Sequence, residues 1–121
     1  MKKCMDMYAL VEIHDGNPKF TPFLNEEIII TDLTMAEFYG VLYNRFDKIT
    51  ADYWNRKFKT FCVPVSQEIL LKAAMLKVDL KKQGVSLIDC VGYTFALENN
   101  MDFVTGDKEF EKMKNVQFMK K

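Results

Sequence analysis

The chain has 121 residues, and its 17 Lys and Arg balance its 17 Asp and Glu, so the formal net charge is zero. This length suits one domain with a substantial core, and we expect residues 1–121 to form a single domain. Because the charges balance, no global field attracts the chain to nucleic acid, and any nucleic-acid function has to meet that objection.

Two classes of protein are excluded early. No stretch approaches the ~20 apolar residues of a membrane span, and Asp6 interrupts a signal-peptide core after the N-terminal lysines, so we expect a cytoplasmic protein with no membrane partner. Cys4, Cys62 and Cys90 are widely spaced and odd in number, which predicts reduced core residues rather than disulfides or a zinc site. With His14 as the single histidine, any chemistry has to depend on carboxylates.

The first half of the chain predicts alternating strands and helices. The run Ile28-Ile29-Ile30 is β-branched and bounded by polar residues, which is typical of a buried parallel strand. Apolar residues that recur at three- and four-residue steps predict amphipathic helices. In chain order we expect a strand ending at about Asp6, a short helix, a strand over 27–31, helices over 33–46 and 51–58, and a strand over 61–65.

The second half continues the same alternation. The longest helical pattern covers 66–83, where Gly84 follows as a C-terminal cap. After it we expect a helix over 86–98, a strand over 102–105, a helical turn over 107–112 and a strand over 116–119. Alternating strands and helices predict a three-layer α/β/α sandwich built on a parallel sheet.

Four acids lie at positions where this fold would bring them to the carboxyl edge of the sheet, but each also has a purely structural interpretation. Asp6 follows the first strand and would equally cap the next helix. Glu37 fits a capping box with Thr34. Asp89 fits a first-turn acid, and Asp107 fits an N-cap. Taken singly, Asp6 leaves both interpretations open, whereas the other three acids favour the structural one.

The combined placement of the acids favours a binding site. In an open parallel sheet the crevice lies beyond the carboxyl ends of the strands, where Asp6, Glu37, Asp89 and Asp107 would all converge. Converging carboxylates repel one another unless a cation lies among them, and an all-oxygen donor set favours Mg²⁺ or Mn²⁺ over zinc. Such a site suits hydrolysis of a phosphodiester.

The residues around these acids resemble a known family, the PIN domain, over nearly the whole chain. The strongest part of the resemblance is Asp89 followed by Thr105-x-Asp107-x-x-Phe110 at a family-like separation. The segments that match the acidic motifs, in order, are Met5-Asp6, Thr34-Met35-Ala36-Glu37-Phe38-Tyr39-Gly40, 86–98 and 103–110, and the helix and glycine over 73–84 match the segment before the third acid.

The resemblance implies a fold, an activity and partners. The fold would be a five-stranded parallel sheet in the order 3-2-1-4-5. The activity would be that of an Mg²⁺- or Mn²⁺-dependent endoribonuclease, and single-domain members of this size are often VapC-type toxins that act with a small antitoxin and form homodimers. Asp6, Glu37, Asp89 and Asp107 would be the catalytic metal ligands, and Thr105 would orient the site with its hydroxyl group.

One departure from the family keeps a second function open. Family members usually carry a small hydroxyl residue and then a polar residue after the first acid, whereas this chain has Met7 and Tyr8. The ring of Tyr8 has two interpretations, packing in the core or stacking on a base. The alternative to a nuclease is a catalytically weakened PIN-like domain that acts as a binding or scaffold module.

Overall fold

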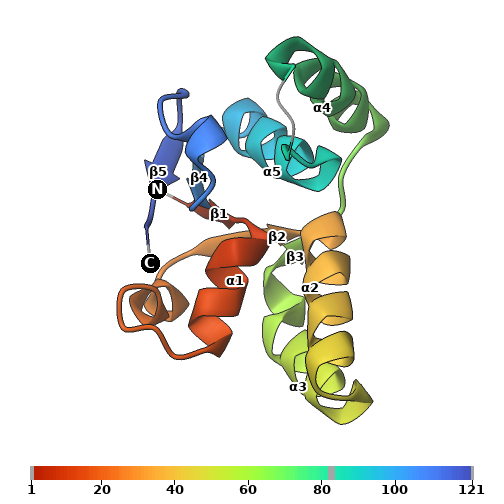
Figure 1. The fold of residues 1–121 in the computed structure, drawn as a ribbon, viewed down its shortest axis with the longest axis vertical. Coiled ribbons are helices and arrows are strands. Elements are labelled where there is room, and N and C mark those ends of the chain that lie inside the picture. Colours follow the sequence, from red (N-terminus) through yellow and green to blue (C-terminus); the bar gives the residue numbers. More distant parts are fainter. Residues whose placement is uncertain (1, 82–83, 121) are drawn as a thin grey trace.

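The five strands form one parallel sheet in the order β3-β2-β1-β4-β5, which confirms the order that the resemblance implied (Figure 1). The computed structural model describes residues 2–81 and 84–120. Strand order reverses between β1 and β4, so the chain leaves the sheet in opposite directions on either side of this pair. The strands are Lys3–Met5 (β1), Ile28–Thr31 (β2), Cys62–Val63 (β3), Asp102–Thr105 (β4) and Val116–Phe118 (β5).

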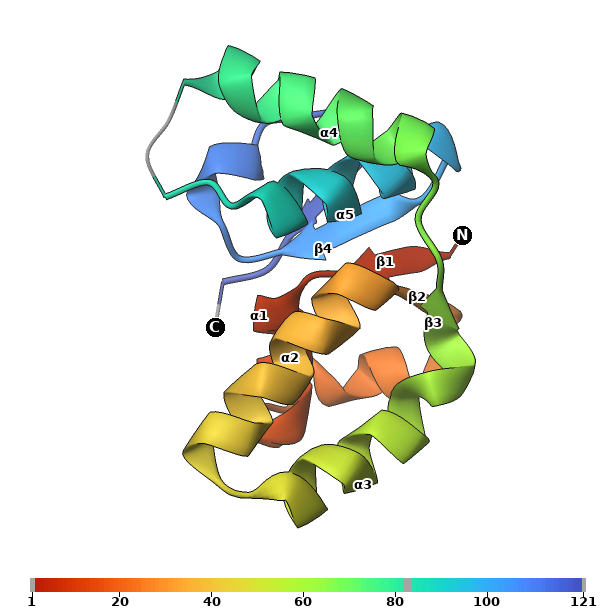
Figure 2. The same ribbon diagram turned by 90° about the vertical axis from the view of Figure 1, so that its right-hand side faces the viewer.

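Helices cover both faces of the sheet and complete the three layers (Figure 2). The pair α4 and α5 lies on one side, and α1, α2 and α3 lie on the other. No helix in residues 2–81 and 84–120 is long and apolar enough to cross a bilayer. The helices are Met7–His14 (α1), Asp32–Arg45 (α2), Lys48–Phe58 (α3), Gln67–Leu80 (α4) and Leu87–Glu98 (α5), with short 3-10 helices at Thr21–Asn25, Lys59–Phe61 and Lys108–Phe110.

Each central strand supplies side chains to both cores. In β1, Cys4 packs with α4 and α5 while Met5 packs with α1 and α2, and in β4 Phe103 and Val104 divide in the same way. This alternation follows from the two-residue period of a strand, and it explains why short strands can be apolar throughout. All three cysteines are free, with Cys4 and Cys90 fully buried and Cys62 partly buried, as a set of reduced core residues requires.

The expected capping box of the second helix is wrong. The structure begins α2 at Asp32, and the capping residue is Thr31, whose hydroxyl oxygen accepts the backbone N–H of Thr34 at 3.2 Å. Thr34 lies inside the helix and its side chain meets that of Thr31. Glu37 is therefore one turn too far along the helix to reach back to the cap, and its structural interpretation is removed.

Several element boundaries also differ from the sequence prediction, and two of them have a plain local cause. Helix α4 ends at Leu80, and Lys81 takes a left-handed conformation with φ of 52°, so the turn begins before the expected end. The predicted end at Gln83 lies outside the described residues. The third strand is shorter than expected because Lys59–Phe61 forms a 3-10 turn and Pro64 has no N–H to extend the ladder beyond Val63.

Candidate active site

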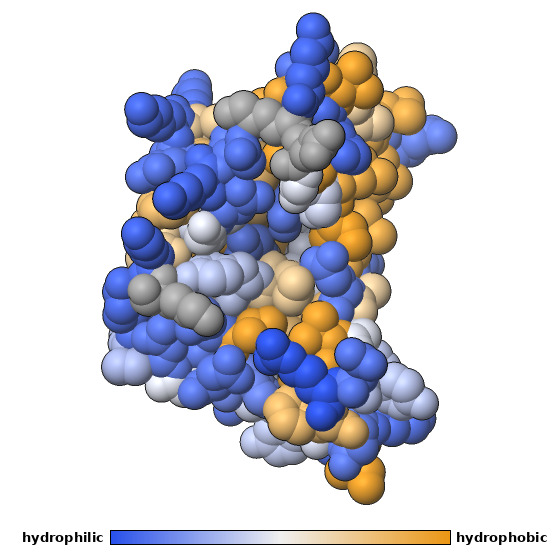
Figure 3. Space-filling view, in the orientation of Figure 1, coloured by the Kyte–Doolittle hydropathy of each residue, from blue (hydrophilic) through white to orange (hydrophobic). Residues whose placement is uncertain are grey.

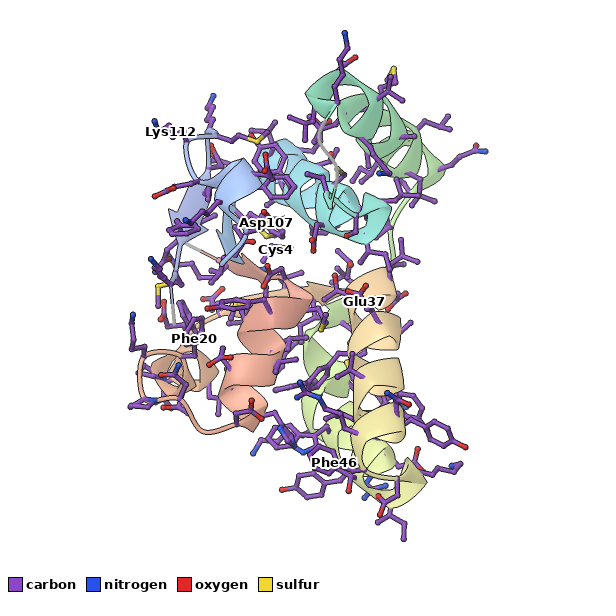
Figure 4. All side chains as sticks on the ribbon, viewed as in Figure 1. Cys4, Phe20, Glu37, Phe46, Asp107 and Lys112 are labelled. Carbon is purple, nitrogen blue, oxygen red and sulfur yellow. The ribbon has the colours of Figure 1, made fainter. Side chains whose placement is uncertain are left out.

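The four predicted acids line one cavity at the carboxyl edge of the sheet. Its volume is about 270 Å³, and the labelled Glu37 and Asp107 in Figure 4 come from two elements that border it, α2 and the segment after β4. The cavity lies beside the reversal between β1 and β4, where the topology predicts a ligand site. It is lined by Asp6, Met7, Tyr8, Glu37, Ser86, Asp89, Gly106 and Asp107.

Asp6 and Asp107 reach the cavity from the ends of neighbouring strands, and each also acts as a cap. Asp6 accepts the backbone N–H of Ala9 at 2.7 Å, and Asp107 accepts the backbone N–H of Glu109 at 2.9 Å. A carboxylate has about four acceptor positions, so one capping bond leaves capacity for another ligand. The capping and site interpretations of these two acids are therefore compatible.

Glu37 and Asp89 approach the cavity from opposite layers. Glu37 lies in the second turn of α2, below the sheet in Figure 1, and Asp89 lies in the first turn of α5, above it. The cap of α5 is Ser86, whose hydroxyl oxygen accepts the backbone N–H of Asp89 at 2.9 Å. Neither helix therefore needs the carboxylate of Glu37 or Asp89 as its N-cap.

Thr105 links the two strand-end acids. Its hydroxyl donates to the carboxylate of Asp6, and the same oxygen accepts the backbone N–H of Asp107 at 3.0 Å. Thr105 is fully buried at the end of β4. Because one hydroxyl makes both bonds, it fixes the separation of the β1 and β4 strand ends and orients the Asp6 side chain.

Burial raises the pKa values of Asp6, Glu37 and Asp89, and repulsion by neighbouring acids adds to the shift of Asp6 and Asp89. Burial raises the pKa of Asp6 to about 7, the bonds from Thr105 and Ala9 oppose this, and the charges of Asp89 and Asp107 raise it further. The pKa of Asp89 rises to about 6, mainly by burial and also through the charges of Glu37 and Asp107. Burial also raises the pKa of Glu37. The contributions of neighbouring acids to the shifts of Asp6 and Asp89 indicate that negative charge in the cavity is poorly compensated.

The donor set fits a hard divalent cation. Every charged side chain that lines the cavity is a carboxylate, and none of the described lining residues is Lys, Arg or His. A cation would relieve the repulsion that raises the pKa of Asp6 and Asp89. Within residues 2–81 and 84–120, no three acidic, His or Cys side chains are already close enough to hold a metal ion. Coordination would therefore include water, as Mg²⁺ sites commonly do.

Two residues of this cavity, Ser86 and Gly106, were not predicted from the sequence as site residues. Ser86 is recognisable from sequence only as a helix cap. Gly106 lies under the ring of Tyr8, where an added Cβ would approach the Tyr8 Cε1 atom to 2.3 Å. The sequence signal for Gly106 is its place between Thr105 and Asp107, but only the structure shows that Tyr8 needs the space.

Solved structures with this fold include several toxin-antitoxin proteins, all of low sequence identity. The toxin-antitoxin complex from Klebsiella pneumoniae has 18% identity and a TM-score of 0.78, with 95% of each chain covered. VapC20 from Mycobacterium tuberculosis, described as a sarcin-ricin loop cleaving toxin, has 12% identity and a TM-score of 0.76, covering 94% of this chain and 96% of its own. VapBC2 from Rickettsia felis, bound to a promoter DNA fragment, has 17% identity and a TM-score of 0.75, with 100% and 99% covered.

Sequence comparison identifies the family. A search among curated proteins found no match. The family model of the PIN domain, a family of nucleases, matches residues 4–116, which include all four acids and Thr105. This match covers most of the chain and agrees with the sheet order and with the place of the cavity. The chain therefore belongs to the PIN domain family.

Proposed function

We propose that this PIN domain is a metal-dependent endoribonuclease that hydrolyses RNA phosphodiester bonds. The observation that carries the proposal is the convergence of four carboxylates from four elements on one cavity that holds no compensating basic side chain in the described residues. Membership of a nuclease family supports the same activity. Residues 1–121 would form a single PIN-like domain, as their length predicts.

Asp6, Glu37, Asp89 and Asp107 would hold Mg²⁺ or Mn²⁺. A divalent ion bound there would supply an activated water and would neutralise charge on the leaving oxygen. The protein's own contribution is to orient these carboxylates: Thr105 holds Asp6, and the bond between Ser86 and Asp89 fixes the start of α5. The buried setting of Asp6 also excludes bulk water from one side of the cavity.

The neutral net charge is compatible with an RNA substrate once the four site acids are set aside. The remaining 13 acidic residues then face 17 basic ones, so the rest of the molecule is basic by difference. A bound cation offsets the acids themselves, and phosphate approaches a surface whose remaining charge attracts it. RNA affinity should therefore depend on the metal.

The toxin of a type II toxin-antitoxin pair is the biological role we propose, with a small antitoxin as partner. Structures of similar fold include toxin-antitoxin complexes from Klebsiella pneumoniae and Rickettsia felis. A surface for such a partner is available on α2, α3 and the turn between them, where large apolar side chains are exposed to more than half of their area. These side chains are Tyr43, Phe46, Ile49 and Tyr53. The cytoplasmic location stays a prediction.

A homodimer through α4 is the assembly we propose. Leu71, Met75 and Val78 are 57%, 59% and 70% exposed and follow one face of α4 at steps of four and three residues. In Figure 3 this part of the molecule, at the upper right, is covered by hydrophobic surface. Two antiparallel copies of α4 would bury this face and bring Glu68 of each copy toward Lys81 of the other, as an isologous interface requires.

Cleavage of RNA by the purified protein tests the activity. We expect cleavage with Mg²⁺ or Mn²⁺ and none with EDTA, and we expect Asp89→Asn to abolish cleavage while its circular dichroism spectrum and unfolding midpoint stay close to those of the wild type. The matched control is Asp102→Asn, because Asp102 lies at the opposite end of β4 in an ion pair with Lys3. This control should cleave normally.

Two results would contradict the proposal. One is cleavage that persists without metal, and the other is unchanged cleavage by Asp89→Asn. A wild-type protein that binds RNA in a metal-dependent way without cleaving it would instead support the alternative function, a PIN-like binding module. The observation that favours this alternative is the presence of Met7 and Tyr8 next to Asp6, where family members usually carry a small hydroxyl residue and a polar residue.

A further inference from the structure

A second cavity adjoins the acid cavity, and the two share a wall. Its volume is about 300 Å³, and both cavities are lined by Met7 and Tyr8. The other lining residues of the second cavity come from α1 and α2, and they are Val11, Glu12, Val41 and Arg45. A ligand seated at the acids therefore has a neighbouring space that is separated from it by Met7 and Tyr8.

Helix α2 sets the direction and the length of this path. Glu37, Val41 and Arg45 are four residues apart, so they follow one face of the helix with a rise of about 6 Å per step. Glu37 borders the acid cavity, and Arg45 borders the second cavity about 12 Å further along the helix axis. In Figure 3, hydrophobic surface is exposed in the gap between α1 and α2.

Tyr8 is held in place at the junction of the two cavities. Its ring meets Phe20 edge to face, with 5.7 Å between centroids and an angle of 77°, and it lies against the backbone of Gly106. Within the described residues, its hydroxyl has no hydrogen-bond partner. The ring is therefore rigid on the protein side, and its hydroxyl stays available to a ligand.

The second cavity has the chemistry of a nucleotide subsite. Met7, Val11 and Val41 form apolar walls, and Tyr8 adds an aromatic ring on which a base can stack. Arg45, one of only two arginines in the sequence, supplies a cation at the far end that can make paired hydrogen bonds to phosphate. The carboxylate of Glu12 is turned to Asn17, whose amide donates to it at 2.9 Å, so it is already engaged.

We propose that this second cavity binds the nucleotide next to the scissile phosphate of single-stranded RNA, with Tyr8 contacting its base and Arg45 contacting the following phosphate. The proposal rests on the proposed nuclease function and names the substrate subsite that continues from the acid cavity. The shared lining by Met7 and Tyr8 favours RNA over a peptide, because a strand with one phosphate at the acids can continue past these residues into the second cavity.

Tyr8 would act as a specificity-determining residue, and an abasic scan tests this. The affinity for a fluorescent single-stranded oligoribonucleotide is measured at equilibrium with Ca²⁺ in place of Mg²⁺. The measurement is then repeated with strands that each lack one base. We expect one abasic position to weaken binding to the wild type by about five- to a hundredfold, the range of base stacking on an aromatic ring. Tyr8→Leu should weaken binding of the intact strand by a similar factor and show no further loss at that position.

Two variants separate stacking from a general loss of structure. Tyr8→Phe keeps the ring against Phe20 and Gly106, so it should retain the abasic profile of the wild type. Tyr53→Leu removes a half-exposed tyrosine from α3, outside both cavities, and should leave RNA binding unchanged.

Arg45 is tested by the salt dependence of binding. Removing one phosphate contact to a single strand should reduce the slope of log K against log salt by about 0.7. We expect this change for Arg45→Met, which keeps the apolar stem. The control Arg56→Met, on α3 and outside both cavities, should leave the slope unchanged.

Each outcome either supports or overturns the subsite. The subsite would be overturned if Tyr8→Leu and Arg45→Met both kept the affinity, the abasic profile and the salt slope of the wild type. It would also be overturned if the wild type did not bind RNA. Unchanged RNA binding together with loss of antitoxin binding in these variants would assign the cavity to a peptide and also overturn it. If RNA binds as expected but is not cleaved with Mg²⁺, the proposed nuclease function fails while the subsite stands.

Discussion

Thr105 donates its hydroxyl hydrogen to the buried carboxylate of Asp6, and so the end of β4 holds the first acid that follows β1. The same hydroxyl oxygen accepts the backbone N–H of Asp107 at 3.0 Å. One side chain therefore serves both strand-end acids of the cavity. This relationship makes Thr105 a positioning residue whose removal should affect both stability and the titration of Asp6.

Replacing Thr105 with Val should separate these two effects. Valine has a similar shape but no hydroxyl, so a buried carboxylate and a partly buried N–H each lose a partner, and the free energy of unfolding should fall by about 1–3 kcal/mol in urea titrations. Loss of the donor should also raise the pKa of Asp6 and move the pH profile of RNA cleavage to higher pH. Thr105→Ser keeps the hydroxyl and should retain the wild-type profile, and an equal shift in both variants would contradict the positioning role.

The stability of the metal-free protein should fall as pH rises from about 4 to 7. Asp6 and Asp89 have pKa values of about 7 and 6 in the folded state, above their ordinary value of 3.8, because burial and neighbouring acids disfavour ionisation. Over this window the folded protein holds protons that the unfolded chain has released, so ionisation destabilises the fold. Urea unfolding in EDTA should show a decrease on the order of 1–4 kcal/mol between pH 5 and pH 8.

The Asp6→Asn variant and the addition of Mg²⁺ test whether the buried acids cause this pH dependence. Asp6→Asn keeps a capping side chain for α1 but cannot ionise, so its stability should depend much less on pH. Adding Mg²⁺ at pH 8 should restore stability to the wild type and less to Asp6→Asn, since a ligand that binds only the folded state stabilises it. A pH dependence that is identical in the two proteins would show that other groups cause it.

The sequence predicted the layers and the convergence of the acids because both follow from short-range patterns. The β-branched run at Ile28–Thr31 and the alternation of strands with helices are sufficient for a parallel sheet, and a parallel sheet brings strand-end acids to one edge. Asp6 and Asp107 thus came together in the prediction without any knowledge of packing. The carboxyl edge of a parallel sheet is determined by topology alone.

The remaining features depend on competition or on packing that one sequence does not reveal. Thr31 and Thr34 both offer a hydroxyl at capping distance from the same helix, and only the extended backbone of Thr31 decides between them. The contact between Tyr8 and Gly106 joins residues 98 positions apart. The cavity between α1 and α2 likewise depends on how these two helices pack against each other on one face of the sheet.

Placing a charge on the apolar face of α4 should abolish the proposed homodimer. Met75 lies at the middle of that face and is 59% exposed, so Met75→Glu would place two carboxylates opposite each other in an antiparallel pair. Size-exclusion chromatography with light scattering should show a dimer for the wild type and a monomer for this variant. Ile49→Glu, on α3 and 79% exposed, is the matched control and should remain dimeric. A monomeric wild type, or a dimeric Met75→Glu protein, would refute this interface.

Adding a methyl group at Gly106 should displace the ring of Tyr8. The new Cβ would lie 2.3 Å from Cε1 and 2.6 Å from Cζ, far inside contact distance, so we expect Gly106→Ala to lose about 1–3 kcal/mol of unfolding free energy and to bind RNA more weakly. In Gly106→Ala/Tyr8→Leu the clash is absent, so the two effects should be less than additive. The control is Gly40→Ala in α2, where nothing lies within 4 Å and a small gain in stability is expected. Strict additivity of Gly106→Ala and Tyr8→Leu in urea titrations would show that the two residues do not constrain each other.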